Sequence, residues 1–223
     1  MTGPEDRPPT MHRFGLALLM LFAATGLAAA HPHVFVDAKE EITFDPEGRM
    51  TAIRHIWQFD EAFTAFAIQG LDANGDGKLS DAELQPLAKV NVDSLKDYRY
   101  FTSLKVAGQH VPVQAPKEYW LDFHSGRLTL FYTLPLKNPT APGKNATLEV
   151  FDPEYFVAFN FVKDGTIHLD GAPASCKAEY RPPHELDDAT MAKLAAIPMD
   201  QRDLPPELAD AASSLASLIT VRC

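Results

Sequence analysis

One stretch of acidic, amide and glycine residues constrains the fold of this chain more than any other feature. The run DANGDGKLSDAE, residues 72–83, matches the EF-hand pattern of a calcium-binding loop at every diagnostic position. A loop of this kind joins two helices, and apolar residues recur at helical spacing on both sides of it. We therefore expect residues 60–102 to form a helix–loop–helix insert.

The loop offers oxygen atoms in the order in which EF-hands bind calcium. Gly77 stands at the sixth position, where the chain must turn sharply. An acidic turn that binds no ion is the alternative. The chain has one such loop and no Met-rich groove, so we interpret the ion as a structural clip between two helices. The alternative is that calcium binding has a regulatory role. The predicted Ca²⁺ ligands are Asp72, Asn74, Asp76, the carbonyl oxygen of Lys78, Ser80 (through a water) and Glu83.

The N-terminal segment has the features of a secretory signal peptide. Arg13 supplies the positive charge, residues 15–27 the apolar region, and Ala28–Ala30 the small residues that precede a cleavage site. A membrane anchor is disfavoured because the apolar run is too short to span a bilayer. We predict that residues 1–30 are removed and that the mature chain is periplasmic, as in a Gram-negative cell.

Charge and composition exclude a nucleic-acid-binding role and favour a globular domain. The chain carries 30 acidic and 20 basic side chains, for a net charge of −10, whereas a protein that follows phosphates needs a basic stripe. No transmembrane helix is expected after the leader. The two cysteines, Cys176 and Cys223, are expected to form a disulfide in an oxidising compartment, with a stabilisation of about 3–4 kcal/mol.

Alternating apolar residues predict a β-hairpin at the start of the mature chain. Residues 33–44 and 49–59 alternate in polarity on either side of the turn Asp45–Gly48. If Phe44 pairs with Arg49, paired residue numbers sum to 93. Even positions then face odd ones, and the apolar sets of both strands fall on one side of the sheet.

Further strand signals follow the insert, and the C-terminal part of the chain is helical in pattern. We expect hairpins at 104–113 and 119–134, strands near 147–151 and 166–169, and a central strand at 155–162, which is apolar on both faces. Helices are expected at 187–196 and 205–219. The predicted fold class is α+β: an antiparallel, sandwich-like β-domain (31–182) with the EF-hand insert, and a helical tail (183–223) held by the disulfide.

Cleavage after residue 30 would place two histidines, His31 and His33, at the new N-terminus. A terminal amine and imidazole nitrogens suit zinc, copper or nickel. The predicted hairpin register sets Asp60 opposite His33, so Asp60 is expected as a carboxylate ligand or as a partner of the histidine. The alternative is that this segment is a polar strand start without a metal.

Other candidate residues favour structural roles. His55 lies on the apolar face of its strand and is interpreted as a core histidine, and Asp152 as a turn residue with a small chance of reaching the metal. His110, His124, His168 and His184 have no convergent partner in the sequence pattern. No nucleophile, phosphate or HExxH motif occurs, so no catalytic residue is predicted and the chain is not expected to be an enzyme.

Five segments together resemble an uncharacterised exported bacterial family. They are HPHVFVDAKEEITF, WQFDEAF, DANGDGKLSDAEL, DYRYFTSL and FDPEYFVAF, and the likeness covers most of residues 31–182. This family is described as the periplasmic component of an ABC-type transport system. Its members are often encoded beside a nickel/cobalt-type permease that in some bacteria looks like a zinc uptake system.

The resemblance implies a non-enzymatic accessory of a transition-metal transporter. The expected cofactors are Ca²⁺ in the loop and Zn²⁺, or nickel or cobalt in its place, at the N-terminal histidines. The expected partner is an inner-membrane metal permease. Two alternatives stay open: an oxygen-activating copper enzyme built on the terminal histidine, and an interaction module whose binding surface calcium orders.

Overall fold

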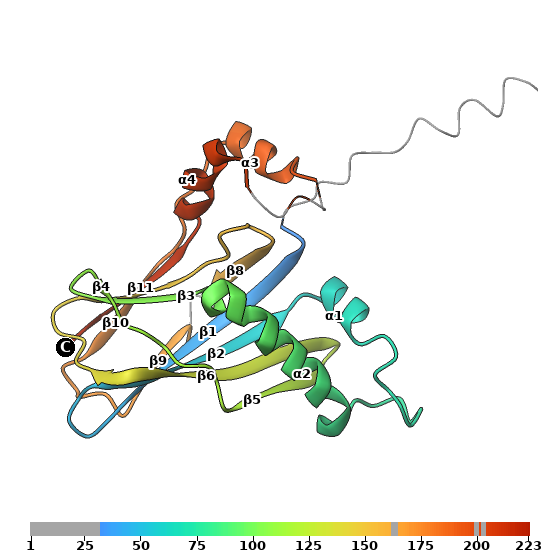
Figure 1. Ribbon diagram of the computed structural model, residues 1–223, viewed down its shortest axis with the longest axis horizontal. Helices are drawn as coiled ribbons and strands as arrows, with labels where there is room; N and C mark the ends of the chain where they lie inside the picture. Colours follow the sequence, from blue (N-terminus) through green and yellow to red (C-terminus); the bar gives the residue numbers. More distant parts are fainter. Residues whose placement is uncertain (1–31, 162–164, 199–200, 202–203) are drawn as a thin grey trace, which may run out of the picture.

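A computed structural model describes residues 32–161, 165–198, 201 and 204–223. In this part of the chain strands predominate: two β-sheets share one apolar core, and four α-helices lie around them (Figure 1). The predicted leader and His31 lie outside the described residues. No helix within these ranges is long and apolar enough to cross a membrane.

The first sheet is built around the predicted N-terminal hairpin. Its strand order is β5-β6-β2-β1-β8, and β9 also pairs with β1. The antiparallel prediction holds for β1–β2, β2–β6 and β5–β6, but β1 pairs in parallel with both β8 and β9. β8 lies at the end of this order, so the prediction of a central strand there is wrong. The strands are β1 (Val34–Phe44), β2 (Met50–Phe59), β5 (Tyr119–His124), β6 (Arg127–Thr140), β8 (Val157–Phe161) and β9 (Ile167–Asp170).

In the β1–β2 hairpin the apolar side chains lie on the predicted side of the sheet, but the register differs from the prediction. Ala38 pairs with Trp57, so even positions of β1 face odd positions of β2, and the apolar side chains of both strands are buried on one side. Trp57 was expected opposite Val36. The paired numbers sum to 95 (38 + 57) instead of 93, so the predicted register is wrong by two residues.

The turn explains this shift. Asp45 and Arg49 pair through their backbones, and the Asp45 carboxylate accepts hydrogen bonds from the N–H and the guanidinium of Arg49. Because Asp45 rather than Phe44 pairs with Arg49, the register moves by one residue. A bulge between Thr43 and Phe44 moves it by one more.

The second sheet contains the C-terminal strand in its interior. Its order is β10-β11-β7-β3-β4, and all its pairs are antiparallel. The disulfide Cys176–Cys223 joins the residue before β10 to the residue after β11. The strands are β3 (Thr102–Val106), β4 (Gln109–His110), β7 (Ala146–Val150), β10 (Lys177–Arg181) and β11 (Ser217–Arg222).

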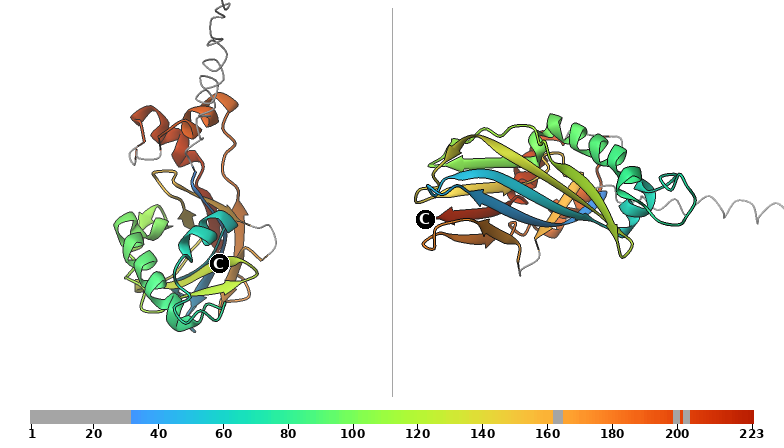
Figure 2. Two further views of the ribbon diagram at one scale, coloured as in Figure 1. Left: turned by 90° about the vertical axis from the view of Figure 1, so that its right-hand side faces the viewer. Right: turned by 90° about the horizontal axis from the view of Figure 1, so that it is seen from below.

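The tail is helical in part only. Helices α3 (Asp188–Ala195) and α4 (Pro206–Ser214) pack on each other at one end of the two sheets, around a small second core that also contains Tyr155 (Figure 2). The predicted helix at 205–219 ends five residues early because Ser213 and Ser214 bond back to helix carbonyls, and the following residues, SLITVR, have β-branched alternation.

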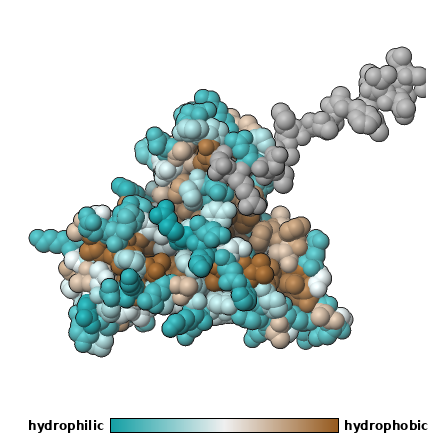
Figure 3. All heavy atoms as spheres, in the orientation of Figure 1, coloured by the Kyte–Doolittle hydropathy of each residue, from teal (hydrophilic) through white to brown (hydrophobic). Residues whose placement is uncertain are grey.

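The insert is a helix–loop–helix at the predicted position. Helix α1 (Glu61–Ala67) leads into the acidic loop, α2 (Asp81–Leu95) follows it, and the 3₁₀ segment η1 (Lys96–Phe101) returns the chain to β3. Helix α2 lies against β5 and covers part of the first sheet. In the space-filling view apolar residues form an interrupted band across the middle of this face (Figure 3).

Candidate metal sites

The acidic loop, residues 72–83, is closed by the carboxylate of its first residue. One oxygen of Asp72 accepts hydrogen bonds from the N–H groups of Gly75 (2.8 Å) and Asp76 (3.2 Å), and the other accepts from Gly77 (2.9 Å). Gly77 has a φ of +77°, a conformation that favours glycine. The loop therefore turns where the sequence predicts it, around the side chain of Asp72.

The last residue of the loop reaches back across it. One carboxylate oxygen of Glu83 accepts the N–H of Ala73 (3.0 Å), and the other accepts the N–H (2.9 Å) and the hydroxyl (2.7 Å) of Ser80. Ser80 and Glu83 form the capping box that begins α2. The hydrogen bonds from Ser80 lower the pKa of the Glu83 carboxyl, which keeps it in the ionised form that a calcium ligand needs.

The donor chemistry of the loop fits a calcium ion. Ionised carboxylates have about four lone-pair sites, and Asp72 and Glu83 each use three of them within the loop. Asp76 accepts two hydrogen bonds, from the N–H of Lys78 and the amide of Asn74. Each predicted carboxylate ligand thus has capacity left for a cation.

The described residues do not themselves establish a metal site. Across residues 32–161, 165–198, 201 and 204–223, no three His, Cys, Asp or Glu side chains converge into a group that could hold a metal ion. The calcium ligands, the carbonyl of Lys78 included, stay a prediction.

Asp60 does not lie where the sequence analysis placed it. In the observed register its backbone N–H donates to the carbonyl of Phe35, so Asp60 stands opposite Phe35 and not opposite His33. Its carboxylate accepts the N–H of Phe35 and of Phe63 (2.8 Å each) and caps α1. The predicted pairing of Asp60 with His33 is therefore wrong, and its carboxylate has a structural role.

A different carboxylate shares a corner of the fold with His33. The N–H of His33 donates to the carbonyl of Phe156 (2.8 Å), and the two rings lie 4.7 Å apart. The N–H of Phe156 in turn donates to the carboxylate of Asp152 (3.0 Å). Asp152 is 1% exposed and also accepts the N–H groups of Glu154 and Val157. His33 and Asp152 are distant in sequence, but both hydrogen-bond to the backbone of Phe156, His33 to its carbonyl and Asp152 to its N–H.

The family of the chain can be assigned at this point. Residues 16–223 match the model of a family described as "Protein of unknown function (DUF1007)". The chain belongs to this family. Membership in an uncharacterised family was expected from the five segments, and the match carries no statement about transport.

A curated relative is equally uncharacterised. The chain is 31% identical over 114 residues to an uncharacterised 15.5 kDa protein in the trpE 3′ region of Spirochaeta aurantia. The alignment covers 50% of this chain and 81% of that protein. Neither comparison assigns a ligand or a reaction.

The sequence analysis missed a buried polar network between the two sheets. Glu40 on β1 is 1% exposed and contacts the fully buried His55 on β2, with 2.6 Å between Oε2 and Nδ1. The indole N–H of Trp57 donates to the other oxygen of Glu40 at 3.4 Å. On the second sheet, the Thr102 hydroxyl lies 3.2 Å from Nε2 of His55 and donates to the carbonyl of Tyr100.

The contacts of Thr102 indicate which ring nitrogen of His55 carries a proton. Because the hydroxyl of Thr102 donates to a carbonyl, its oxygen accepts from Nε2–H of His55. The other ring nitrogen, Nδ1, lies 2.6 Å from Oε2 of Glu40. The interpretation of His55 as a core histidine is confirmed, and the ring also stacks on Tyr132 at 4.5 Å. The missed signal was the break in the apolar alternation of β1 at Glu40.

Proposed function

We propose that the chain is an exported metal-binding accessory protein. It carries Ca²⁺ in the loop 72–83 as a structural clip and takes a transition metal, zinc first, at the histidines of its mature N-terminus, for an inner-membrane permease. The metal-binding part of this proposal rests on one observation, the arrangement of the loop around the carboxylates of Asp72 and Glu83. The disulfide supports export because such bonds persist in oxidising compartments.

The role of calcium follows from the position of the loop. The loop connects α1 to α2, and α2 packs on β5 and leads through η1 into β3. An ion between the two helix ends restricts the insert and with it one covering layer of the first sheet. In this role a weak site, with a dissociation constant of about 10⁻⁴–10⁻³ M, suffices outside the cytosol.

Calcium is expected to bind with one ion per chain and to raise the melting temperature by about 5–10 °C at a hundredfold excess over the dissociation constant. Glu83→Gln removes the ligand that closes the shell and is expected to weaken binding by more than about a hundredfold. Calorimetric titration of the chelator-treated protein measures both. Asp81→Asn is the matched control, since Asp81 is an exposed acid of the same loop outside the ligand set. Equal affinities for Glu83→Gln and wild type would contradict the site.

The transition-metal part rests on the N-terminal corner. His33 lies beside a segment that contains the buried carboxylate of Asp152, and a carboxylate near an imidazole is the usual environment of a zinc-binding histidine. His31 is the second proposed ligand and precedes the described residues. Asp60 is no longer part of this proposal, because its carboxylate caps α1.

Correctly processed, calcium-loaded protein is expected to bind one zinc per chain, and His33→Ala to abolish that zinc while leaving calcium in place. Elemental analysis of protein purified from the periplasm is the measurement. His110→Ala, on an exposed strand end, and Asp60→Asn are expected to retain zinc. An unchanged zinc content in His33→Ala would contradict the transition-metal role, but not the calcium site. Copper bound in preference to zinc, with redox turnover, would favour the enzyme alternative.

A further inference from the structure

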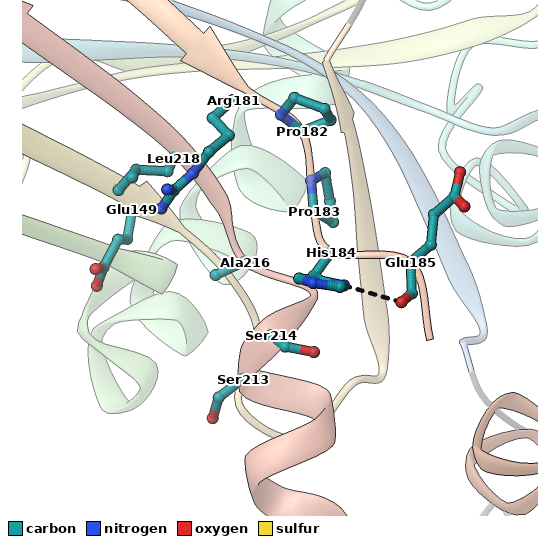
Figure 4. Close-up of a pocket in the computed structure, with 10 residues that line it drawn as sticks. All are labelled: Glu149, Arg181, Pro182, Pro183, His184, Glu185, Ser213, Ser214, Ala216 and Leu218. Atoms are coloured by element: carbon teal, nitrogen blue, oxygen red, sulfur yellow. Dashed lines mark hydrogen bonds between the residues drawn. The ribbon is translucent and has the colours of Figure 1, made fainter. Parts of the chain in front are cut away.

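A cavity whose lining contains none of the proposed metal ligands lies where the second sheet meets the C-terminal helices. It has a volume of about 640 Å³, within the usual range for small-molecule sites. Its base is a row of three side chains on adjacent strands, because Arg181 of β10 pairs with Leu218 of β11, which pairs with Glu149 of β7. Figure 4 shows ten residues that line it.

Two further segments wall this cavity. After Arg181 the chain leaves the sheet through Pro182 and Pro183, and the N–H of His184 donates to the carbonyl of Ser214 at the end of α4 (3.0 Å). This bond holds the proline segment against the helix end. The cavity is therefore bounded by secondary structure on one side and by a rigid, proline-containing segment on the other.

The charges of the cavity leave one cation available. Glu149 is bound by Lys105, with both carboxylate oxygens within 3.2 Å of the ammonium nitrogen. Figure 4 shows the side chains of Glu149 and Glu185 turned away from the middle of the cavity, whereas Arg181 extends over the sheet toward Leu218. Among the described residues, no carboxylate lies within ion-pair distance of Arg181.

The other polar groups that line the cavity add little to the binding of an anion, which favours a ligand with a single negative charge. The ring of His184 uses Nδ1 on the carbonyl of Glu185 (3.0 Å), which leaves Nε2 for a ligand. The hydroxyls of Ser213 and Ser214 donate to helix carbonyls, so their oxygens can only accept from a ligand. Two nearby glutamates and a net charge of −10 oppose a dianion such as phosphate.

We propose that this cavity, the Arg181 pocket, binds a small organic monocarboxylate. The carboxylate pairs with the planar guanidinium of Arg181, which matches its two oxygens. The apolar body of the ligand lies against Pro182, Pro183, Ala216 and Leu218, which line the same cavity. This site is independent of the proposed metal sites, because none of its residues belongs to them.

Hexanoate is the probe that combines one carboxylate with an apolar chain, and hexanamide is its uncharged counterpart. Titration calorimetry or ligand-observed NMR on the calcium-loaded protein is expected to show one hexanoate per chain and no binding of hexanamide. Arg181→Gln is expected to weaken hexanoate by about ten- to a hundredfold, the loss that a charge-assisted hydrogen bond predicts.

Arg222→Gln is the matched control for this variant. Arg222 lies on the same sheet beyond the cavity, where it pairs with Glu179 at 2.8 Å, so this variant is expected to bind hexanoate like wild type. Three results would overturn the proposal: no binding of hexanoate at millimolar concentration, equal binding by Arg181→Gln, or inorganic phosphate binding as tightly as hexanoate. Thermal unfolding of both variants checks that they are folded, so that a loss of hexanoate binding can be assigned to the Arg181 pocket.

Discussion

Glu40→Ala is expected to lower the free energy of unfolding by about 3–5 kcal/mol. The substitution leaves Nδ1 of His55 and the indole N–H of Trp57 without their polar partner in the core. Unpaired polar groups of this kind cost about 1–3 kcal/mol each. Urea denaturation followed by tryptophan fluorescence and by circular dichroism measures the loss.

The neighbouring residue pair provides the control. Glu41 and Arg54 are paired across the same two strands as Glu40 and His55, but on the opposite face, where both side chains are half-buried. Their ion pair spans 3.1 Å, and its side chains are 31% and 35% exposed. Glu41→Ala is therefore expected to cost less than about 1 kcal/mol. Equal losses for Glu40→Ala and Glu41→Ala would show that burial of the network contributes nothing.

Glu40→Gln separates charge from hydrogen bonding. Its amide can donate to Nδ1 of His55 and accept from Trp57, so a smaller loss than for alanine is expected. Burial raises the pKa of the Glu40 carboxyl above its ordinary value of 4.5, against the lowering influence of His55. The carboxyl group of Glu40 thus binds its proton more tightly in the folded state than in the unfolded state. Wild type is expected to lose stability relative to Glu40→Gln as the pH rises above 4.5.

Features with a local cause were predictable from the sequence. The acidic loop is specified by consecutive residues, and its turn at Gly77 and its position between two helices are as expected. The facing of the β1–β2 hairpin was predicted because side chains alternate with a period of two. A register error of two residues preserves that alternation, so the correct faces were assigned with the wrong partners.

The same register error concealed the buried network. With paired numbers summing to 93, Glu40 faces Ile53 and has the pattern of an isolated polar residue. With the observed sum of 95 it faces His55. One residue of the shift comes from turn contacts between Asp45 and Arg49 and the other from the bulge at Thr43 and Phe44, and strand periodicity reports neither.

Local sequence patterns could not predict which distant segments pair in the sheets. Nothing in the alternation of β1 specifies that β8 and β9 run parallel to it. The corner that joins His33 to Asp152 through Phe156 depends on that parallel pairing, so the sequence analysis gave Asp60 the role of the nearby carboxylate. Likewise, β11 has strand propensity, but its place between β10 and β7 is a property of the whole sheet.

Loss of the disulfide is expected to lower the free energy of unfolding by about 4 kcal/mol. Cys176 and Cys223 are separated by 47 residues, and the chain-entropy relation assigns this amount to a loop of that length. For a domain of this size the loss corresponds to a fall in melting temperature of about 8–16 °C. The double variant Cys176→Ser/Cys223→Ser tests this by calorimetry.

The topology makes the consequence of this loss specific. The closed loop contains α3, α4 and β11, and β11 hydrogen-bonds to strands on both of its sides. Without the cross-link, amide exchange is expected to increase first in β11, from Arg222 inward, and then in β10. Reductant should reproduce the effect in wild type and change nothing in the double variant. A wild-type protein whose melting temperature is unaffected by reductant would contradict this account, since the two neighbouring strands alone would then hold the C-terminal strand in the sheet.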